Sequence, residues 1–144
     1  GEFDVPILVK ADGARTRWLK APNEAEPQVP AASDLVIPIA SAAVVGEPLD
    51  SEHVHRPEWV ASLTGLSIGD EIRPTDVATV LSDERGGLKR VPDDTRVIPL
   101  VNMVDNEELA RPARAIATDL RANSRIDRVV LGRMDRGRVV DVVD

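Results

Sequence analysis

The fold is decided by residues 96–123, which read RVIPLVNMVDNEELARPARAIATDLRAN. Arg96 to Val101 is a continuous apolar run, which is typical of a strand buried on both faces of a parallel sheet. Asn106 to Asn123 has apolar residues at the spacing of a helix that covers such a sheet, and Asp105 or Asn106 is suited to cap its first turn. A strand followed directly by a helix predicts an α/β fold.

The same alternation recurs on both sides of this stretch. Apolar runs of strand type extend over Val5 to Ala11, Asp34 to Ala40, Arg128 to Gly132 and Arg138 to Val143. Shorter helices are expected over Pro57 to Thr64 and Thr75 to Ser82. The strand prolines, which cannot donate to a ladder, predict strand edges or breaks at Pro6, Pro38 and Pro99. We therefore expect one α/β domain over residues 1–144, with a mostly parallel, doubly wound sheet between two helix layers (three-layer αβα).

The composition excludes several classes of protein. The 144 residues carry 25 Asp and Glu against 18 Lys and Arg, a net charge of −7, so neither nucleic acid nor an anionic membrane is an expected partner. No run approaches the roughly 18 apolar residues of a membrane span, and no signal peptide is evident, which predicts a soluble, cytoplasmic protein. Cysteine is absent, which excludes disulfides and thiolate metal sites. Scarce Lys with abundant Asp favours a halophilic source, although a high-GC genome would also replace Lys with Arg.

Asp12 follows the expected strand at Val5 to Ala11. A carboxylate at the end of an apolar strand is the Walker B arrangement, in which it holds Mg²⁺ at the sheet edge. Gly13 would let a phosphate or a metal approach the backbone closely. The alternative is an Asp-Gly turn that simply leaves a strand. Asp12 is therefore the candidate metal ligand.

Asn102-Met103-Val104-Asp105 follows the strand at Arg96 to Val101. This segment resembles the Asn-Lys-x-Asp element of GTPases, in which the Asp carboxylate accepts hydrogen bonds from guanine. Met103 stands where Lys is usual, so it can pack on a purine face but brings no charge. The alternative is that Asn and Asp only cap the next helix. Because ligands of open α/β sheets bind at the carboxyl ends of strands, Asn102 and Asp105 are candidate nucleotide-binding residues.

A phosphate-binding loop is absent from the sequence. No G-x-x-x-x-G-K-[ST] occurs, and Gly86-Gly87-Leu88-Lys89 has neither its spacing nor a preceding strand. Without such backbone donors, phosphoryl transfer loses most of its electrostatic stabilisation, so this chain alone is not expected to hydrolyse a nucleoside triphosphate. Gly1-Glu2-Phe3, with no Met, is read either as a cloning remnant or as the stump of a longer chain.

Several short motifs together resemble the segment that marks the YqeC family. They are Ala11-Asp12-Gly13-Ala14, Lys20-Ala21-Pro22, Glu26-Pro27 with Val29-Pro30, Val54-His55-Arg56, Gly86-Gly87-Leu88-Lys89 and Asn102 to Asp105. The combination of K-A-P with E-P-x-x-P is the specific part of this resemblance. The resemblance also continues through the expected strand at Asp34 to Ala40, but this strand and the Asn-x-x-Asp segment are shared widely among nucleoside triphosphatases.

The resemblance implies a P-loop NTPase-like fold whose amino-terminal P-loop unit is missing from this chain. It also implies an accessory or maturation role toward a selenium-dependent molybdenum hydroxylase or its molybdenum cofactor, with Mg and GTP or ATP used by the intact protein. Lys20 and Arg15 lie on the long loop from Gly13 to Ser33, where they would meet phosphate or else form surface ion pairs.

His53 and His55 flank Val54, and residues i and i+2 of a strand share a face, so a two-His metal site is one interpretation. No third strong ligand is evident, which favours imidazoles that cap the turn before the helix at Pro57. Arg56 either reaches the ligand or pairs with an acid.

Three functional hypotheses follow. The leading one is a nucleotide-binding maturation factor, in which Asp12 serves metal, Asn102 and Asp105 serve a base, and Lys20 with Arg15 serves phosphate. The alternative is a non-catalytic module, with a degenerate nucleotide-binding fold, that binds cofactor or docks on the hydroxylase. The third is a fragment of a complete NTPase. A sheet without its P-loop unit would expose apolar surface, which predicts a homo-oligomer.

Overall fold

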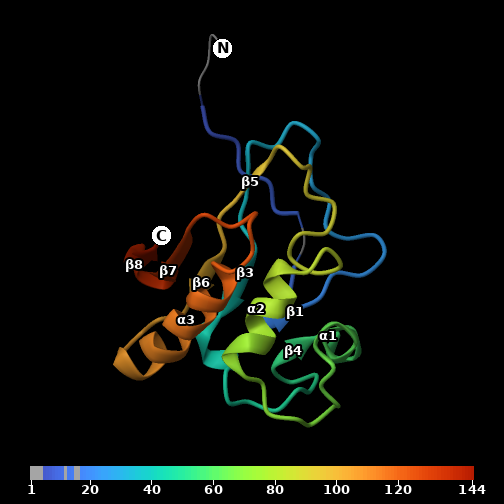
Figure 1. Ribbon diagram of the computed structural model, residues 1–144, viewed down its shortest axis with the longest axis vertical. Coiled ribbons are helices and arrows are strands. Elements are labelled where there is room, and N and C mark those ends of the chain that lie inside the picture. Colours follow the sequence, from blue (N-terminus) through green and yellow to red (C-terminus); the bar gives the residue numbers. More distant parts are fainter. Residues whose placement is uncertain (1–4, 12, 15–16) are drawn as a thin grey trace.

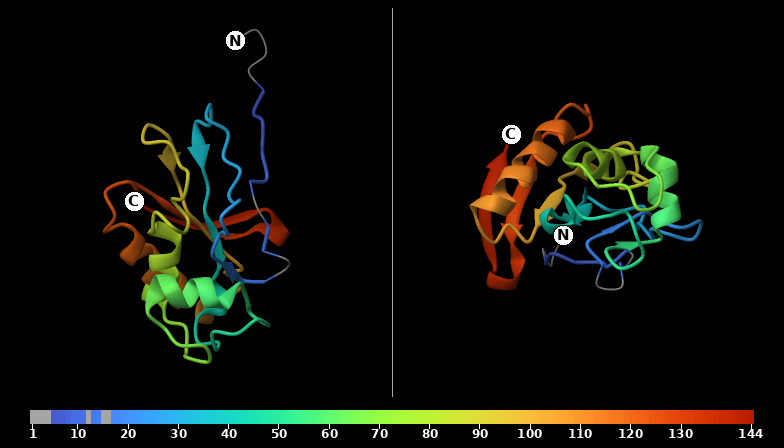
Figure 2. Two further views of the ribbon diagram at one scale, coloured as in Figure 1. Left: turned by 90° about the vertical axis from the view of Figure 1, so that its right-hand side faces the viewer. Right: turned by 90° about the horizontal axis from the view of Figure 1, so that it is seen from below.

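The computed structural model describes residues 5–11, 13–14 and 17–144. Its largest sheet has the strand order β3-β6-β7-β8, formed by Ile39–Ser41, Leu100–Asn102, Val129–Arg133 and Arg138–Val143. Strands β3, β6 and β7 are parallel, and β8 is antiparallel to β7. Two parallel pairs complete the β structure: β1-β4 (Leu19–Lys20, Val54–His55) and β2-β5 (Leu35–Val36, Arg96–Val97). The expected α/β fold with mostly parallel strands is therefore confirmed (Figures 1 and 2).

The three expected helices are confirmed with small changes at their ends. They are α1 (Pro57–Thr64), α2 (Pro74–Ser82) and α3 (Glu107–Leu120), and short 3-10 helices occur at Ala42–Val44 and Met134–Arg136. Asn106 caps α3, because its side-chain oxygen accepts from the Leu109 N–H at 3.0 Å. Helices α2 and α3 pack against each other in front of the sheet, and α1 packs on α2 (Figure 1).

Prolines divide the strands at the places where they were expected to do so. Asp34 to Ala40 contains two strands that stop and restart around Pro38, and Arg96 to Val101 is divided in the same way around Pro99. The Leu100 N–H still donates to the Pro38 carbonyl at 2.9 Å, so the two segments remain side by side across the break. The long loop after Gly13 was expected to be irregular throughout, but it contains β1.

The strand expected at Val5 to Ala11 is wrong. Residues 5–11 have no strand assignment, and Ile7 and Leu8 are 85% and 91% exposed. Pro6 cannot donate to a ladder, and among the described residues the Gln28 N–H donates to the Ala11 carbonyl at 3.0 Å. This apolar run has the composition of a strand, but no strand in the described part of the chain pairs with it.

Of the two faces of the main sheet, the described helices cover only one. Cross-strand partners share a face, and the row Ala40, Val101 and Leu131 is buried toward the helices. The next row along the strands is Ile39, Leu100, Val130 and Val142, and it lies on the opposite face. Ile39 and Val142 there are 58% and 41% exposed. The third layer of the expected αβα arrangement is therefore not found among the described residues.

Within the described part of the chain, no helix has both the length and the apolar character needed to cross a membrane.

Candidate functional site

Glu26 is the centre of an ion network that joins three separate parts of the chain. Its two carboxylate oxygens accept from Lys20 Nζ at 2.9 Å and from Arg56 Nη1 at 2.6 Å. The three side chains are 10–23% exposed. Burial by itself would raise the pKa of Glu26, but the hydrogen bonds and charges of Lys20 and Arg56 outweigh it and lower the pKa from 4.5 to about 2. Glu26 is therefore ionised at every physiological pH.

The network fixes Lys20 at the carboxyl end of β1. Lys20 Nζ also donates to the Gly13 carbonyl at 2.7 Å, so the segment before β1 is held close to the loop after it. Arg56 occupies the left-handed region (φ 59°) as the residue that precedes α1. Such a conformation is uncommon for a residue other than glycine, and it persists only where the surroundings enforce it. The Glu26 carboxylate is part of those surroundings.

The turn after α2 closes over this region because two glycines let it pack against the helix. A Cβ added to Gly86 would lie 2.1 Å from the Val80 carbonyl oxygen, and one added to Gly87 would lie 2.0 Å from that of Leu81. The Gly87 N–H donates to the Val80 carbonyl at 2.8 Å, which caps the end of α2. The Gly86-Gly87 pair is thus a requirement of close backbone packing.

Lys89 and Arg90, which follow this turn, hold the loop that contains Glu26. Lys89 Nζ donates to the Asn23 carbonyl, and Arg90 donates to the carbonyls of Glu24 and, at 3.1 Å, Ala25. Arg90 also has a positive φ of 61°. The motif residues Lys20, Glu26 and Arg56 and the Gly86-to-Lys89 turn therefore meet around one loop, although they are far apart in the sequence.

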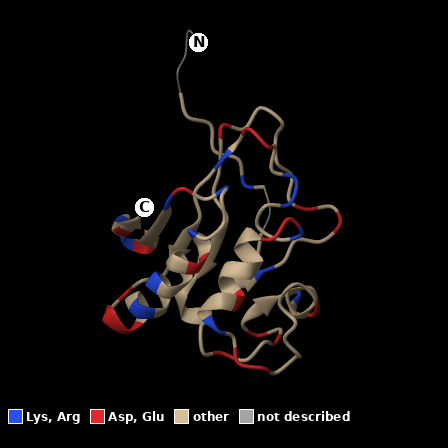
Figure 3. Cartoon of the chain, viewed as in Figure 1, with Lys and Arg blue, Asp and Glu red and all other residues tan. Residues whose placement is uncertain are grey.

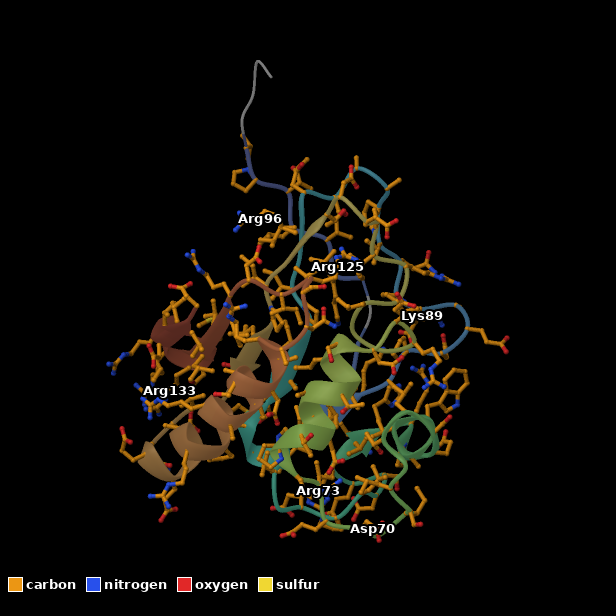
Figure 4. The ribbon with its side chains drawn as sticks, in the orientation of Figure 1. Asp70, Arg73, Lys89, Arg96, Arg125 and Arg133 are labelled. Atoms are coloured by element: carbon orange, nitrogen blue, oxygen red, sulfur yellow. The ribbon has the colours of Figure 1, made fainter. Side chains whose placement is uncertain are left out.

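A pocket of about 490 Å³ lies beside this loop. Its lining residues come from α1, from the glycine turn and from the start of the loop: Glu58, Trp59, Ser62, Leu63, Glu84, Arg85, Lys89 and Ala21. Figure 4 shows Lys89 on the side of the molecule that carries α1. This pocket was not predicted from the sequence, because its walls combine ordinary surface residues of a helix with a turn that no local pattern places opposite it.

Asn102 and Asp105 belong to a second network at the carboxyl end of β6. The Asn102 side-chain oxygen accepts from the Met134 N–H at 2.9 Å, and Asp105 lies 3.4 Å from Arg133 Nε. Met103 between them has φ 60°, and its sulfur lies 3.0 Å from the Ser41 hydroxyl. Figure 4 shows Arg133, the partner of Asp105, on the opposite side of the molecule from Lys89. The hydrogen bonds given for this network and for the Glu26 network have no residue in common.

The predicted site residues are therefore only partly brought together. Lys20 lies in the Glu26 network, whereas Asn102 and Asp105 share the network at the end of β6. Asp12 and Arg15 lie outside the described residues. Of the two interpretations of Arg56, pairing with an acid is confirmed.

His53 lies in an acidic corner near β4. Its Nδ1 is 2.7 Å from Asp50 Oδ1, its Nε2 is 3.2 Å from Glu47, and its ring lies against Trp18 with centroids 5.7 Å apart. Figure 3 shows acidic residues gathered on the loops at this end of the molecule, at the bottom of the view. The hydrogen bond to Asp50 raises the pKa of His53, partial burial opposes this, and the charges of Asp50 and Glu47 add to it.

We expect His53 to titrate above 6.5, because its charged form has a carboxylate partner in the folded state. A raised pKa stabilises the fold fully below pH 6.5, and this contribution is lost as pH rises through the folded pKa. NMR titration of the imidazole would measure this. Asp50→Asn should bring the pKa back toward 6.5, while exposed Asp93→Asn should leave it unchanged. An unchanged pKa in Asp50→Asn would refute the pairing.

The three residues of the Glu26 network lie in the part of the chain that matches a known protein family. The family model described as "YqeC protein" matches residues 1–58, which include Lys20, Glu26 and Arg56. A curated relative from Escherichia coli (strain K12), described as "Uncharacterized protein YqeC", is 36% identical over 101 residues. The chain belongs to the YqeC family.

The match to the YqeC relative covers 70% of this chain and 39% of the relative's length, so the chain corresponds to about two fifths of that protein. No solved structure matches the chain. All three members of the Glu26 network lie within the residues that the YqeC family model matches, whereas Asn102, Asp105 and the glycine turn lie beyond them.

Proposed function

We propose that this chain is part of an accessory or maturation protein for a selenium-dependent molybdenum hydroxylase, and that the intact protein binds a nucleotide. Membership of the YqeC family supports the accessory role through the resemblance described above. The nucleotide is supported by one geometric observation: polar residues stand at the carboxyl ends of parallel strands, Lys20 at the end of β1 and Asn102 at the end of β6. Open α/β sheets bind ligands at the carboxyl ends of their strands, which makes both positions candidate contacts.

In this proposal different residues contact the base, the phosphate and the metal ion of the nucleotide. Asn102 and Asp105 offer an amide and a carboxylate to a base, and Lys20 with Arg15 offers positive charge to phosphate. Asp12 offers an oxygen ligand of the kind that Mg²⁺ prefers. The Glu26 carboxylate orients Lys20, because its hydrogen bond holds the ammonium group at the carboxyl end of β1.

Calorimetry with Mg-GTP and Mg-ATP tests the nucleotide proposal. We expect saturable heat with one of them, and a loss of affinity of at least about tenfold, equal to about 1.4 kcal/mol, in Asn102→Ala and in Lys20→Ala. Arg111→Ala, an exposed cation on α3, is the matched control and should bind normally. Thermal melts of each variant separate a lost contact from a lost fold. Saturable binding that neither substitution weakens would reject these residues as the site.

A non-catalytic docking module is the second candidate, and the uncovered sheet face favours it. The row Ile39, Leu100, Val130 and Val142 forms a contiguous apolar strip with no helix over it among the described residues. Surfaces of this kind mark protein interfaces. No heat with either nucleotide, together with concentration-dependent sedimentation of the isolated chain, would favour this candidate over the first.

A further inference from the structure

The pocket beside the Glu26 loop has one wall suited to a flat ring. Trp59 projects from α1 and is 37% exposed, and Leu63 lies one turn further along the same helix. Ala21, which is buried, also lines the pocket. An exposed indole beside aliphatic groups is a surface on which a planar ring stacks with little dependence on its identity. The apolar wall therefore indicates a planar ligand but does not distinguish one planar ring from another.

The polar lining indicates which ring would bind, because it offers hydrogen-bond acceptors and donors on different elements. Glu58 on α1 and Glu84 on the turn are exposed acids, and no hydrogen bond or ion pair engages either of them within the part of the chain that is described. Arg85 and Lys89 supply donors from the turn. Arg85 Nε is 3.3 Å from Asp83, which leaves its terminal amino groups for a ligand. The pocket therefore presents two acceptor carboxylates and two cationic donors around one aromatic surface.

We propose that this pocket binds a guanine-type ring, a 2-amino-6-oxopurine. Such a ring carries N–H donors on the edge that includes its 2-amino group and acceptors at O6 and N7 on the adjacent edge. The carboxylates of Glu58 and Glu84 receive the N–H edge, the groups of Arg85 and Lys89 donate to the oxo edge, and Trp59 stacks on the ring face. Adenine lacks the 2-amino group and has no oxygen at position 6, so it mismatches both edges.

This pocket is lined by none of the residues assigned to the strand-end site, although Ala21 in its lining directly follows Lys20. It contains neither Asn102 nor Asp105, whose network lies on the other side of the molecule. An experiment can therefore refute the guanine pocket without refuting nucleotide binding by Asn102 and Asp105, and the reverse. Guanosine, which has no phosphate, is the appropriate probe, because it isolates ring recognition from the phosphate contacts expected of Lys20 and Arg15.

Fluorescence of Trp59 measures the binding directly. The chain has two tryptophans, so Trp18→Phe leaves Trp59 as the single reporter. In that background we expect saturable quenching by guanosine and binding of adenosine at least about tenfold weaker. Glu58→Gln and Glu84→Gln should each weaken guanosine binding at least about tenfold, because the lost carboxylate received the N–H edge. Glu71→Gln, an exposed glutamate outside the pocket, should bind guanosine normally.

Any of the following results would overturn the proposal. The first is no saturable quenching by guanosine, and the second is equal binding of guanosine and adenosine. The third is guanosine binding that survives both glutamate substitutions or disappears in Asn102→Ala, since the latter would assign the ring to the strand-end site. Binding that is lost in Glu58→Gln and retained in Asn102→Ala supports the pocket, whatever the outcome of the Mg-GTP and Mg-ATP titrations.

Discussion

Gly87→Ala is expected to lower the free energy of unfolding by about 3 kcal/mol or more, the upper end of the cost of overpacking. The added Cβ would lie 2.0 Å from the Leu81 carbonyl oxygen and 2.7 Å from its carbon, and a backbone carbonyl at the end of α2 cannot rotate away as a side chain can. Either the turn must lift from the helix or the last turn of α2 must unwind. Urea unfolding followed by circular dichroism would measure the change.

Gly13→Ala is the matched control for this substitution. Its added Cβ would meet the flexible end of Lys10 at 3.5 Å, which can move aside, whereas the Cβ added at Gly87 meets a fixed backbone carbonyl. The control should change stability by less than about 1 kcal/mol. Equal stability of the two variants would show that the glycine turn does not pack against α2 in solution.

Glu26→Gln is expected to destabilise the fold by about 2 kcal/mol at pH 7 and to remove part of its acid sensitivity. The substitution keeps the shape of the side chain but leaves Lys20 and Arg56 without the anion that compensates their partial burial. Urea unfolding at pH 7 would measure the first effect. Glu24→Gln, two residues earlier and exposed, is the control and should be nearly neutral.

The pH dependence of the same variant has a defined sign. Because the pKa of Glu26 is about 2 in the fold against 4.5 for an unperturbed glutamate, its stabilisation is complete above pH 4.5 and is lost as pH falls toward 2. Wild-type stability should therefore decline across this window more steeply than that of Glu26→Gln. Parallel pH profiles of the two proteins would contradict the network.

The sequence predicted the helices and the interior strands well, because those elements are specified locally. The apolar spacing of α3, its Asn106 cap and the breaks at Pro38 and Pro99 all act within a few residues. It failed at Val5 to Ala11, where an apolar run has strand composition but burial depends on a neighbouring strand. The pattern of apolar residues shows which side chains a segment could bury. It does not show whether a neighbouring strand is present to pair with that segment.

The candidate site was predicted in part for a similar reason. Lys20 was identified from its motif, but the network around it joins Glu26 to Arg56, 30 positions further along the chain, and no local pattern encodes such a contact. A signal was nevertheless present, since the loop that follows Lys20 contains two acids close to the basic motif residues. The pocket next to Trp59 had no such signal, because it exists only where the glycine turn faces α1.

The way in which Lys89 and Arg90 hold the loop has a consequence for its evolution. Both cations donate to main-chain carbonyls at residues 23–25, which every amino acid supplies. The identities of residues 24 and 25 can therefore drift while the path of the chain through them stays constant, whereas Asn23 also accepts the Ala25 N–H through its side chain at 2.9 Å.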